Sequence, residues 1–306
     1  MPSARRKKFR DSRIRAHIKE GSYFTFGKLS KIIIPFLVLV IGFAFFRFST
    51  RYWNGHDKVS FVTPLKNGDV EVVVLDPKLD ETSKLIIPGD TEVDVAENYG
   101  VLKIKNVWQL SQNEKRRGRL LPETVTQDFL FPTTLWSKEP LDNIWKFIFN
   151  PEDTNIAFGD RVTIGIFALR VPTLGRTEIN LGQSQFLKKT KLSDGSSGYQ
   201  LVGTPSERLT IYFADNDLTQ GNLKVNIVDA TGVVGVSDTV GEIIQVLGGK
   251  VVSIDKKAPE STDCLLLGSN KVVVRKIATL FSCQIGSTST NFDVEIHLGA
   301  NFAKRF

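Results

Sequence analysis

The residues best suited to chemistry in this sequence are the cations of the run Lys115-Arg116-Arg117-Gly118-Arg119. A guanidinium group offers paired N–H donors that match the oxygens of a phosphate. Arg116, Arg117 and Arg119 could therefore hold a pyrophosphate, a teichoic-type polymer or lipid headgroups. A solvated loop without a ligand would show the same pattern. We treat the three arginines as candidate ligand-binding residues.

Two glycine-containing loops are further candidates. Pro88-Gly89-Asp90 could contact a ligand, or it could be a simple turn with Asp90 as a capping residue. The stretch DATGVVG, from Asp229 to Gly235, precedes a predicted helix and could place a phosphate at the helix N-terminus. It lacks both the G-x-G-x-x-G pattern and the P-loop lysine, so a tight turn is the favoured interpretation.

The remaining reactive side chains form no familiar catalytic or metal-binding pattern. The three histidines are scattered, and the sequence contains neither G-x-S-x-G nor H-E-x-x-H. No metal site is predicted from the histidines. Trp108, Trp136 and Trp145 are expected in the core rather than on a glycan-binding surface.

The positive charge of the chain is concentrated at its N-terminus. Residues 1–31 hold ten Lys/Arg and two Asp/Glu, whereas the remainder carries a balance of −1. A DNA-binding surface needs this charge on the folded part, so nucleic acid is excluded as a partner. The stretch 29–48 reaches the ~20 residues of a membrane-spanning helix if Lys31 and Arg47 extend to the two interfaces.

The charges around this stretch predict its orientation. Because basic residues precede it, residues 1–28 should be a cytoplasmic tail in a single-pass protein of the cell membrane. Bulky residues in RFSTRYW disfavour signal-peptide cleavage, so 29–48 is predicted to be a retained signal anchor, followed by a linker at 49–58. The remainder should be extracytoplasmic. The lipid bilayer is a predicted partner, and the basic tail could contact anionic lipid or simply set the topology.

Cys264 and Cys283 are the two cysteines of the chain, and no C-x-x-C spacing occurs. Outside the cytoplasm they can be oxidised. One begins a predicted strand and the other follows the helix beside it, so they could form a disulfide; two buried thiols are the alternative. A closed loop of about 20 residues would stabilise the fold by ~3 kcal/mol in a loop-entropy account.

The first half of the folded part is predicted to be mixed α/β. VEVVVL at 70–75 and the segment 84–87 are apolar and end at proline-containing turns, which predicts a strand hairpin before the Pro88 loop. VLKIKNV at 101–107 alternates as a half-buried strand does. Short helices are expected in two further segments, 123–129 and 141–149. Residues 155–167 are left open between a helix and a strand over 162–167.

The last part of the chain predicts alternating strands and helices. In order, these are a strand at 223–228, a helix at 236–247, strands at 250–254 and 264–267, a helix capped by Asn270 at 270–281, and a strand at 292–298. The β-α-β-β-α-β order indicates a small two-layer unit. The predicted fold class is α+β: a transmembrane helix, a mixed α/β domain and this C-terminal domain.

This C-terminal segment carries a distinctive set of small residues. A strand ends in Asp229-Ala-Thr-Gly, a second glycine follows at Gly235, a glycine precedes the next strand, and the final strand closes with Leu-Gly. In these features residues 222–302 resemble the LytR C-terminal domain of bacterial envelope proteins, in which asparagine is common where Asp229 stands. The resemblance implies such a domain over 218–306.

The hairpin segment VEVVVLDPKLDETSKLIIPGDTEVDV contains a strand, an Asp-Pro turn, a second strand and Ile-Pro-Gly-Asp-Thr. It is similar to the strands and Ile-Pro-Arg-Asp-Thr motif of the LytR–CpsA–Psr domain, which implies such a domain over 59–217. Members of that family transfer glycopolymers from a polyprenyl-pyrophosphate carrier to peptidoglycan. Their arginines hold the pyrophosphate, and acidic residues help to bind a divalent cation. Pro88, Asp90 and Thr91 match the motif, but Gly89 takes the arginine position and cannot supply its charge.

Three functions follow as alternatives. The first is a membrane-anchored envelope protein that binds or organises cell-wall or surface polymer without catalysis, because Gly89 replaces the expected arginine. The second is a glycopolymer phosphotransferase that uses Arg116, Arg117 or Arg119, with Mg²⁺ on Asp90 as the one metal candidate. The third is an accessory protein-binding subunit of an envelope complex. Predicted partners are therefore cell-wall glycopolymer, polyprenyl-linked glycan or envelope proteins, and no cofactor is expected outside the transferase alternative.

Overall fold

The computed structural model describes residues 33–43, 52–150, 152–221, 223–287 and 290–306. The chain divides into two compact units, residues 1–45 and 46–306. In the first unit, residues 33–43 form a helix whose apolar side chains are exposed. Among the described residues, no helix combines the length and apolar character needed to cross a membrane. The predicted tail and the two ends of the predicted span lie outside the described residues.

The first sheet of the second unit has the strand order β6-β1-β2-β3-β7. In chain order its strands are β1 (Val59–Pro64), β2 (Val70–Asp76), β3 (Glu81–Ile87), β6 (Leu135–Trp136) and β7 (Arg176–Asn180). The central three pair antiparallel, and the two edge strands run parallel to their neighbours. The predicted hairpin is confirmed as β2 and β3, with Val70 opposite Ile87.

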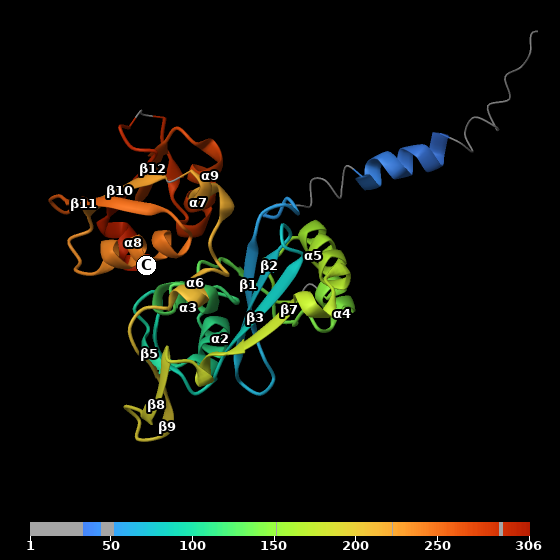
Figure 1. The fold of residues 1–306 in the computed structure, drawn as a ribbon, viewed down its shortest axis with the longest axis horizontal. Helices are drawn as coiled ribbons and strands as arrows, with labels where there is room; N and C mark the ends of the chain where they lie inside the picture. The colour runs from blue at the N-terminus through green and yellow to red at the C-terminus, as the bar shows by residue number, and fades with distance from the viewer. Residues whose placement is uncertain (1–32, 44–51, 151, 222, 288–289) are drawn as a thin grey trace, which may run out of the picture. The chain divides into compact units, whose positions relative to one another are not determined.

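Helices cover both faces of this sheet (Figure 1). All seven residues of β2 are buried, and successive side chains of a strand point to opposite faces. Val72 joins a core that includes residues of α2 (Ile104–Asn113) and α3 (Leu120–Asp128). Val73 joins a second core that includes residues of α4 (Ile144–Phe149) and α5 (Phe158–Arg170). The apolar run of β2 does not alternate because helices cover both faces of the sheet at this strand.

One prediction for this part is wrong, and one stretch that the sequence left open is a helix. Only the start of 101–107 is a strand: β5 (Gly100–Lys103) pairs with β4 (Glu92–Val95), and α2 begins at Ile104. The Ile104 amide donates to the carbonyl of Thr91 at 2.8 Å, which turns the chain into the helix. Residues 162–167 lie within the helix α5. Gly165 lets α4 pack closely there, since a Cβ at this position would lie 2.7 Å from Ile148.

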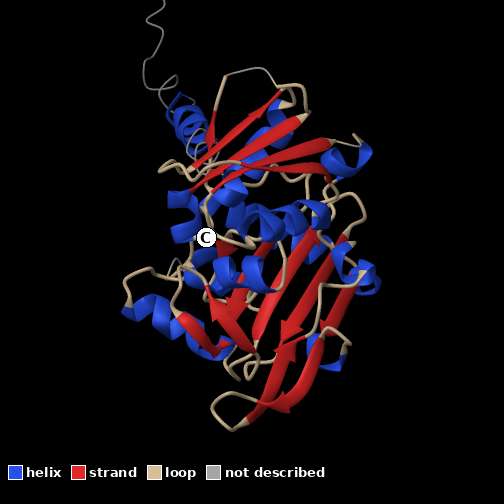
Figure 2. Ribbon diagram, turned by 90° about the vertical axis from the view of Figure 1, so that its left-hand side faces the viewer, coloured by secondary structure: helices blue, strands red, loops and turns tan. Residues whose placement is uncertain are grey.

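The second sheet has the order β11-β10-β14-β12-β13 and carries the predicted C-terminal alternation, with two elements added. In chain order the elements are β10 (Lys224–Ala230), α8 (Val236–Val246), β11 (Lys250–Lys256), β12 (Cys264–Gly268), α9 (Lys271–Phe281), β13 (Gln284–Ile285), β14 (Val294–Gly299) and α10 (Ala300–Arg305). The Asn270 side chain accepts from the amides of Val272 and Val273, so the predicted helix cap is confirmed. Figure 2 shows helices lying against the strands of both sheets.

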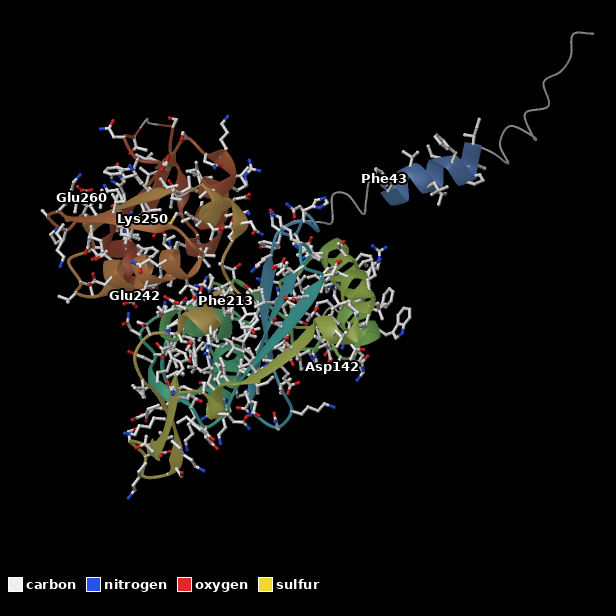
Figure 3. The ribbon with its side chains drawn as sticks, viewed as in Figure 1. Phe43, Asp142, Phe213, Glu242, Lys250 and Glu260 are labelled. Carbon is white, nitrogen blue, oxygen red and sulfur yellow. A yellow bond between two sulfur atoms is a disulfide. The ribbon has the colours of Figure 1, made fainter. Side chains whose placement is uncertain are left out.

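The remaining elements lie between α5 and the second sheet, with η1 before β7 and the others after it. These are two 3-10 turns, η1 (Thr173–Gly175) and η2 (Leu181–Gln183), the hairpin β8 (Leu187–Lys191) and β9 (Ser197–Leu201), and the short helices α6 (Glu207–Thr210) and α7 (Asn216–Gln220). Just after α6, Phe213, labelled in Figure 3, stacks on Phe131 with ring centres 4.6 Å apart. This contact fixes the segment to the core that contains α2 and α3.

Candidate functional site

The Pro88-Gly89-Asp90 loop follows β3 and is closely packed at Gly89. The Gly89 amide donates to the Asp69 carboxylate at 2.8 Å. A Cβ on Gly89 would lie within 3.0 Å of the Gly68 carbonyl oxygen and 3.2 Å from the Cβ of Lys105. The backbone of the preceding turn thus occupies the space that a side chain would need. The loop has no room for the arginine that the resembled motif places here.

Asp90 carries the carboxylate that the transferase alternative assigns to a cation. Its Oδ1 pairs with the Nζ of Lys105 at 2.6 Å, and about half of the Asp90 side chain is exposed. The Thr91 hydroxyl donates to the Pro88 carbonyl at 2.6 Å, which closes the turn. In the described ranges of the chain, no group of three or more His, Cys, Asp or Glu side chains is placed to hold a metal ion.

The arginine run follows α2, and its charges are partly neutralised within the chain. Arg116 Nη2 lies 2.7 Å from Glu97 Oε2, and Arg119 pairs with the other oxygen of the same carboxylate. Arg119 Nε also lies 2.9 Å from Glu123 Oε1. Arg117 is exposed and has a left-handed backbone, with φ of 57°. The structure thus gathers Arg116 and Arg119 around Glu97, and it gives no contact between them and Asp90 in the described residues.

Glu123, on α3, is a residue that the sequence did not single out. Burial raises its pKa to about 7, against the attraction of the neighbouring Arg119 guanidinium. Arg119 and Glu123 both line a cavity of about 600 Å³. A carboxyl group that titrates near neutral pH beside a cation can hold or release a proton under physiological conditions.

This cavity adjoins a second one of about 740 Å³, and together they form a cleft. We name it the Arg275 cleft. The residues that line both cavities are Tyr52, Thr133, Thr134, Arg275, Thr279 and Leu280. They come from the start of the unit, from the segment before β6 and from α9. The cleft therefore combines a guanidinium group and threonine hydroxyls with an apolar wall.

The cations around the Arg275 cleft differ in how far they are neutralised. Lys58 pairs with Asp76 at 3.1 Å. Arg305 pairs with Asp263 at 2.9 Å. Arg275 is exposed, and no ion pair of its guanidinium group is found within the described part of the chain. Arg275 is therefore the lining cation with most capacity left for an anionic ligand.

Lys276, next to Arg275, joins distant parts of the unit. Its Nζ lies 2.7 Å from Asp217, 2.8 Å from Asp215 and 3.3 Å from Asp57. Burial lowers the pKa of Lys276, but hydrogen bonds to Asp215 and Asp217 outweigh it, and the net shift is upward. The lysine thus holds α9 against α7 and against the start of the unit, which fixes one wall of the cleft.

The two cysteines lie at one end of the cleft, which Cys283 lines. Cys264 begins β12 and Cys283 follows α9. The structure joins them in a disulfide, with Cα atoms 4.7 Å apart. The bond connects the end of α9 to the second sheet, next to the wall that carries Arg275.

The DATGVVG loop is held by its own side chains. Asp229 Oδ1 accepts from the Thr231 amide at 3.0 Å and from its hydroxyl at 2.6 Å. Asp229 Oδ2 accepts from the Ser237 hydroxyl at 2.7 Å. Gly232 and Gly235 have positive φ angles of 72° and 93°. The arrangement is that of a tight turn leading into α8, as the sequence favoured.

The sequence offered little signal for the residues of the Arg275 cleft. Glu123 stands four residues after Arg119 near the start of a predicted helix, which is the spacing of a helical ion pair. Arg275 lies on a predicted helix, but no feature of the sequence distinguishes it as a binding residue from Lys271 on the same helix. The cleft walls come from segments more than 100 residues apart, so no local pattern could unite them.

Comparisons with known proteins give partial structural matches. No protein-family model matches the chain, and no curated protein matches it. TagT of Bacillus subtilis aligns at 12% identity and a TM-score of 0.30, over 50% of this chain and 88% of that one. The LytR-CPS2A-psr family protein YwtF (TagT), with bound octaprenyl pyrophosphate lipid, aligns at 12% identity and a TM-score of 0.33, over 50% and 87%. A Streptococcus agalactiae protein aligns at 10% identity and a TM-score of 0.32, over 67% and 93%.

One of these structures is named for the family that the hairpin segment resembles. TM-scores of 0.30 to 0.33 do not establish a shared fold.

Proposed function

We propose that this chain is a membrane-anchored, extracytoplasmic envelope protein that binds or organises a cell-wall or surface glycopolymer without catalysing its transfer. The observation that carries the proposal is the packing at Gly89, where no arginine side chain fits. Three of the four cations that could replace it have ion pairs within the chain, whereas Arg117 has none among the described residues. Glu97 pairs with Arg116 and Arg119, and Lys105 pairs with Asp90. A transfer site that must hold a pyrophosphate would need these cations free.

The Arg275 cleft is the proposed binding site. Its volume is that of a small-ligand pocket, and its lining offers a guanidinium group together with the hydroxyls of Thr134 and Thr279. In a phosphate-bearing sugar polymer, the phosphate oxygens can accept from the guanidinium group, and the sugar hydroxyls can bond to the threonine hydroxyls. We propose contacts of this kind with one or two repeat units of the polymer.

The experiment uses the full-length chain in nanodiscs, with an octaprenyl-pyrophosphate-linked glycan and Mg²⁺. Binding and phosphate release are followed together. We expect binding without release, and Arg275→Ala should weaken binding by about tenfold because a charge-assisted contact is lost. Lys271→Ala, an exposed cation on the same helix, is the matched control and should leave binding unchanged. Release above that of an Arg116→Ala/Arg119→Ala variant would overturn the non-catalytic proposal.

The phosphotransferase remains a second candidate because of Glu123. A carboxyl group with a pKa of about 7 beside Arg119 could act as a general acid or base in the cleft. If release is detected, Glu123→Gln should abolish it while leaving binding in place. If neither release nor binding is detected, the accessory protein-binding subunit becomes the function to test.

A further inference from the structure

Large apolar side chains are exposed along α4, α5 and the turn that follows them. Trp145 is 73% exposed, Leu169 is 64% exposed and Leu174 is 99% exposed. Phe149 and Ile166 are also exposed. We call these five residues the α4–α5 apolar face. The expectation that Trp145 lies in the core is wrong, and an exposed tryptophan in such a group marks an interaction surface.

Ring contacts make much of this face continuous. Trp145 and Phe149, one helical turn apart on α4, stack with ring centres 5.9 Å apart. Phe149 then meets Phe158, at the start of α5, at 6.2 Å. Ile166 lies two helical turns beyond Phe158 on α5. Figure 3 shows side chains of this region, near the labelled Asp142, pointing outward.

The first described residues of the second unit, Tyr52 and Trp53, contact α5 of the same helix pair. The amides of Tyr52 and Trp53 donate to the Asp160 carboxylate of α5 at 3.1 and 3.3 Å. The Trp53 ring meets Phe167 of α5 edge-on at 5.7 Å. Only residues 49–51 separate the predicted anchor from Tyr52. The anchor of the proposed function and the contacts of Tyr52 and Trp53 with α5 are therefore close together along the chain.

The charges near the face are arranged in a way that a membrane surface tolerates. Lys146 and Arg170 are exposed and stand next to Trp145 and Leu169 in the sequence. Their long stems can lie along apolar surface while the charged ends reach lipid headgroups. The nearby acid Asp142 is neutralised by Lys84 at 2.5 Å. Tryptophan is favoured at the membrane interface because its ring is apolar and its N–H remains hydrated.

We infer that the α4–α5 apolar face lies in the interfacial region of the bilayer, on the side where the anchor emerges. The face thereby holds the folded unit against the membrane rather than leaving it on a free linker. This inference rests on the anchor of the proposed function and does not depend on the ligand of the cleft. Interfacial binding of this kind grows with the apolar area that enters the headgroup layer.

The test uses the full-length chain in vesicles of phosphatidylethanolamine and phosphatidylglycerol. A nitroxide label is attached to Leu169→Cys, or to Val234→Cys as a matched control, because Val234 is 92% exposed in the turn before α8. Flotation with the vesicles first establishes that the chain is anchored. The accessibility of each label to oxygen, which enters lipid, is then compared with its accessibility to a water-soluble nickel complex.

We expect the oxygen-to-nickel ratio to be at least ~3-fold higher at position 169 than at position 234, because only the first label reaches the apolar layer. A low accessibility of position 169 to both reagents would mean that a second copy of the chain covers the face, and it would overturn the inference. Equal ratios at both positions in a floating chain would overturn it too, while leaving the anchor intact. Failure to float would overturn both the anchor and the inference.

Discussion

At the scale of single residues, Gly89 stands at the position where the resembled motif has an arginine, and its surroundings are closely packed. The Gly68 carbonyl oxygen lies within 3.0 Å of the position that a Cβ would take. We expect Gly89→Ala to destabilise the unit by about 1–3 kcal/mol through overpacking. Urea unfolding monitored by tryptophan fluorescence would measure the change. Gly241→Ala is the control, because its nearest contact would be 3.6 Å away in the helix α8 and alanine is the better helix former.

Glu123 predicts a pH dependence at the same scale. Burial raises its pKa from 4.5 to about 7, so the folded chain binds this proton more tightly than the unfolded chain does. The contribution to stability is complete below pH 4.5 and is lost as the pH rises through 7. Glu123→Gln should therefore reduce the fall in melting temperature between about pH 5 and pH 8. The exposed Glu114→Gln should leave that fall unchanged, and an equal slope for Glu123→Gln and wild type would contradict the assignment.

At the scale of elements, α9 is held in place by one cation among three carboxylates. Lys276→Met should leave Asp57, Asp215 and Asp217 without their shared partner and destabilise the unit by about 1–3 kcal/mol, since the lysine is only partly buried. The exposed Lys271→Met on the same helix should change stability by less than about 0.5 kcal/mol. Chemical unfolding measures both variants. Equal stabilities would show that apolar packing alone positions α9.

At the scale of the whole molecule, the charge distribution predicts a fixed orientation in the membrane. In a bacterial host, the full-length chain should stay with the membrane fraction after alkaline washing, and protease added outside should digest the part after residue 58. Replacing the basic residues of 1–28 with glutamine should lower the fraction in this orientation, because positive charge is what retains the tail inside. Release of the unmodified chain by alkaline washing would contradict the anchor.

Local patterns in the sequence were enough for several elements of the fold. The Val70–Leu75 run and its Asp-Pro turn predicted the β2–β3 hairpin, and Asn270 predicted the start of α9. These signals succeed because β-branched side chains, prolines and capping groups act on their own backbone. Local patterns did not decide the secondary structure of residues 162–167. The apolar residues of this segment alternate, but packing of Ile148 against Gly165 stabilises a helix.

The sequence by itself determined where the charge lies, which segments alternate, and that Gly89 removes a cation from the motif it resembles. Only the tertiary structure decided that Arg116 and Arg119 share Glu97, that Lys276 meets Asp57 across 219 residues, and that Arg275 lines a cleft. The reason is physical. A side chain's type fixes what it can bind, but whether its charge is free depends on partners that folding brings from distant parts of the chain.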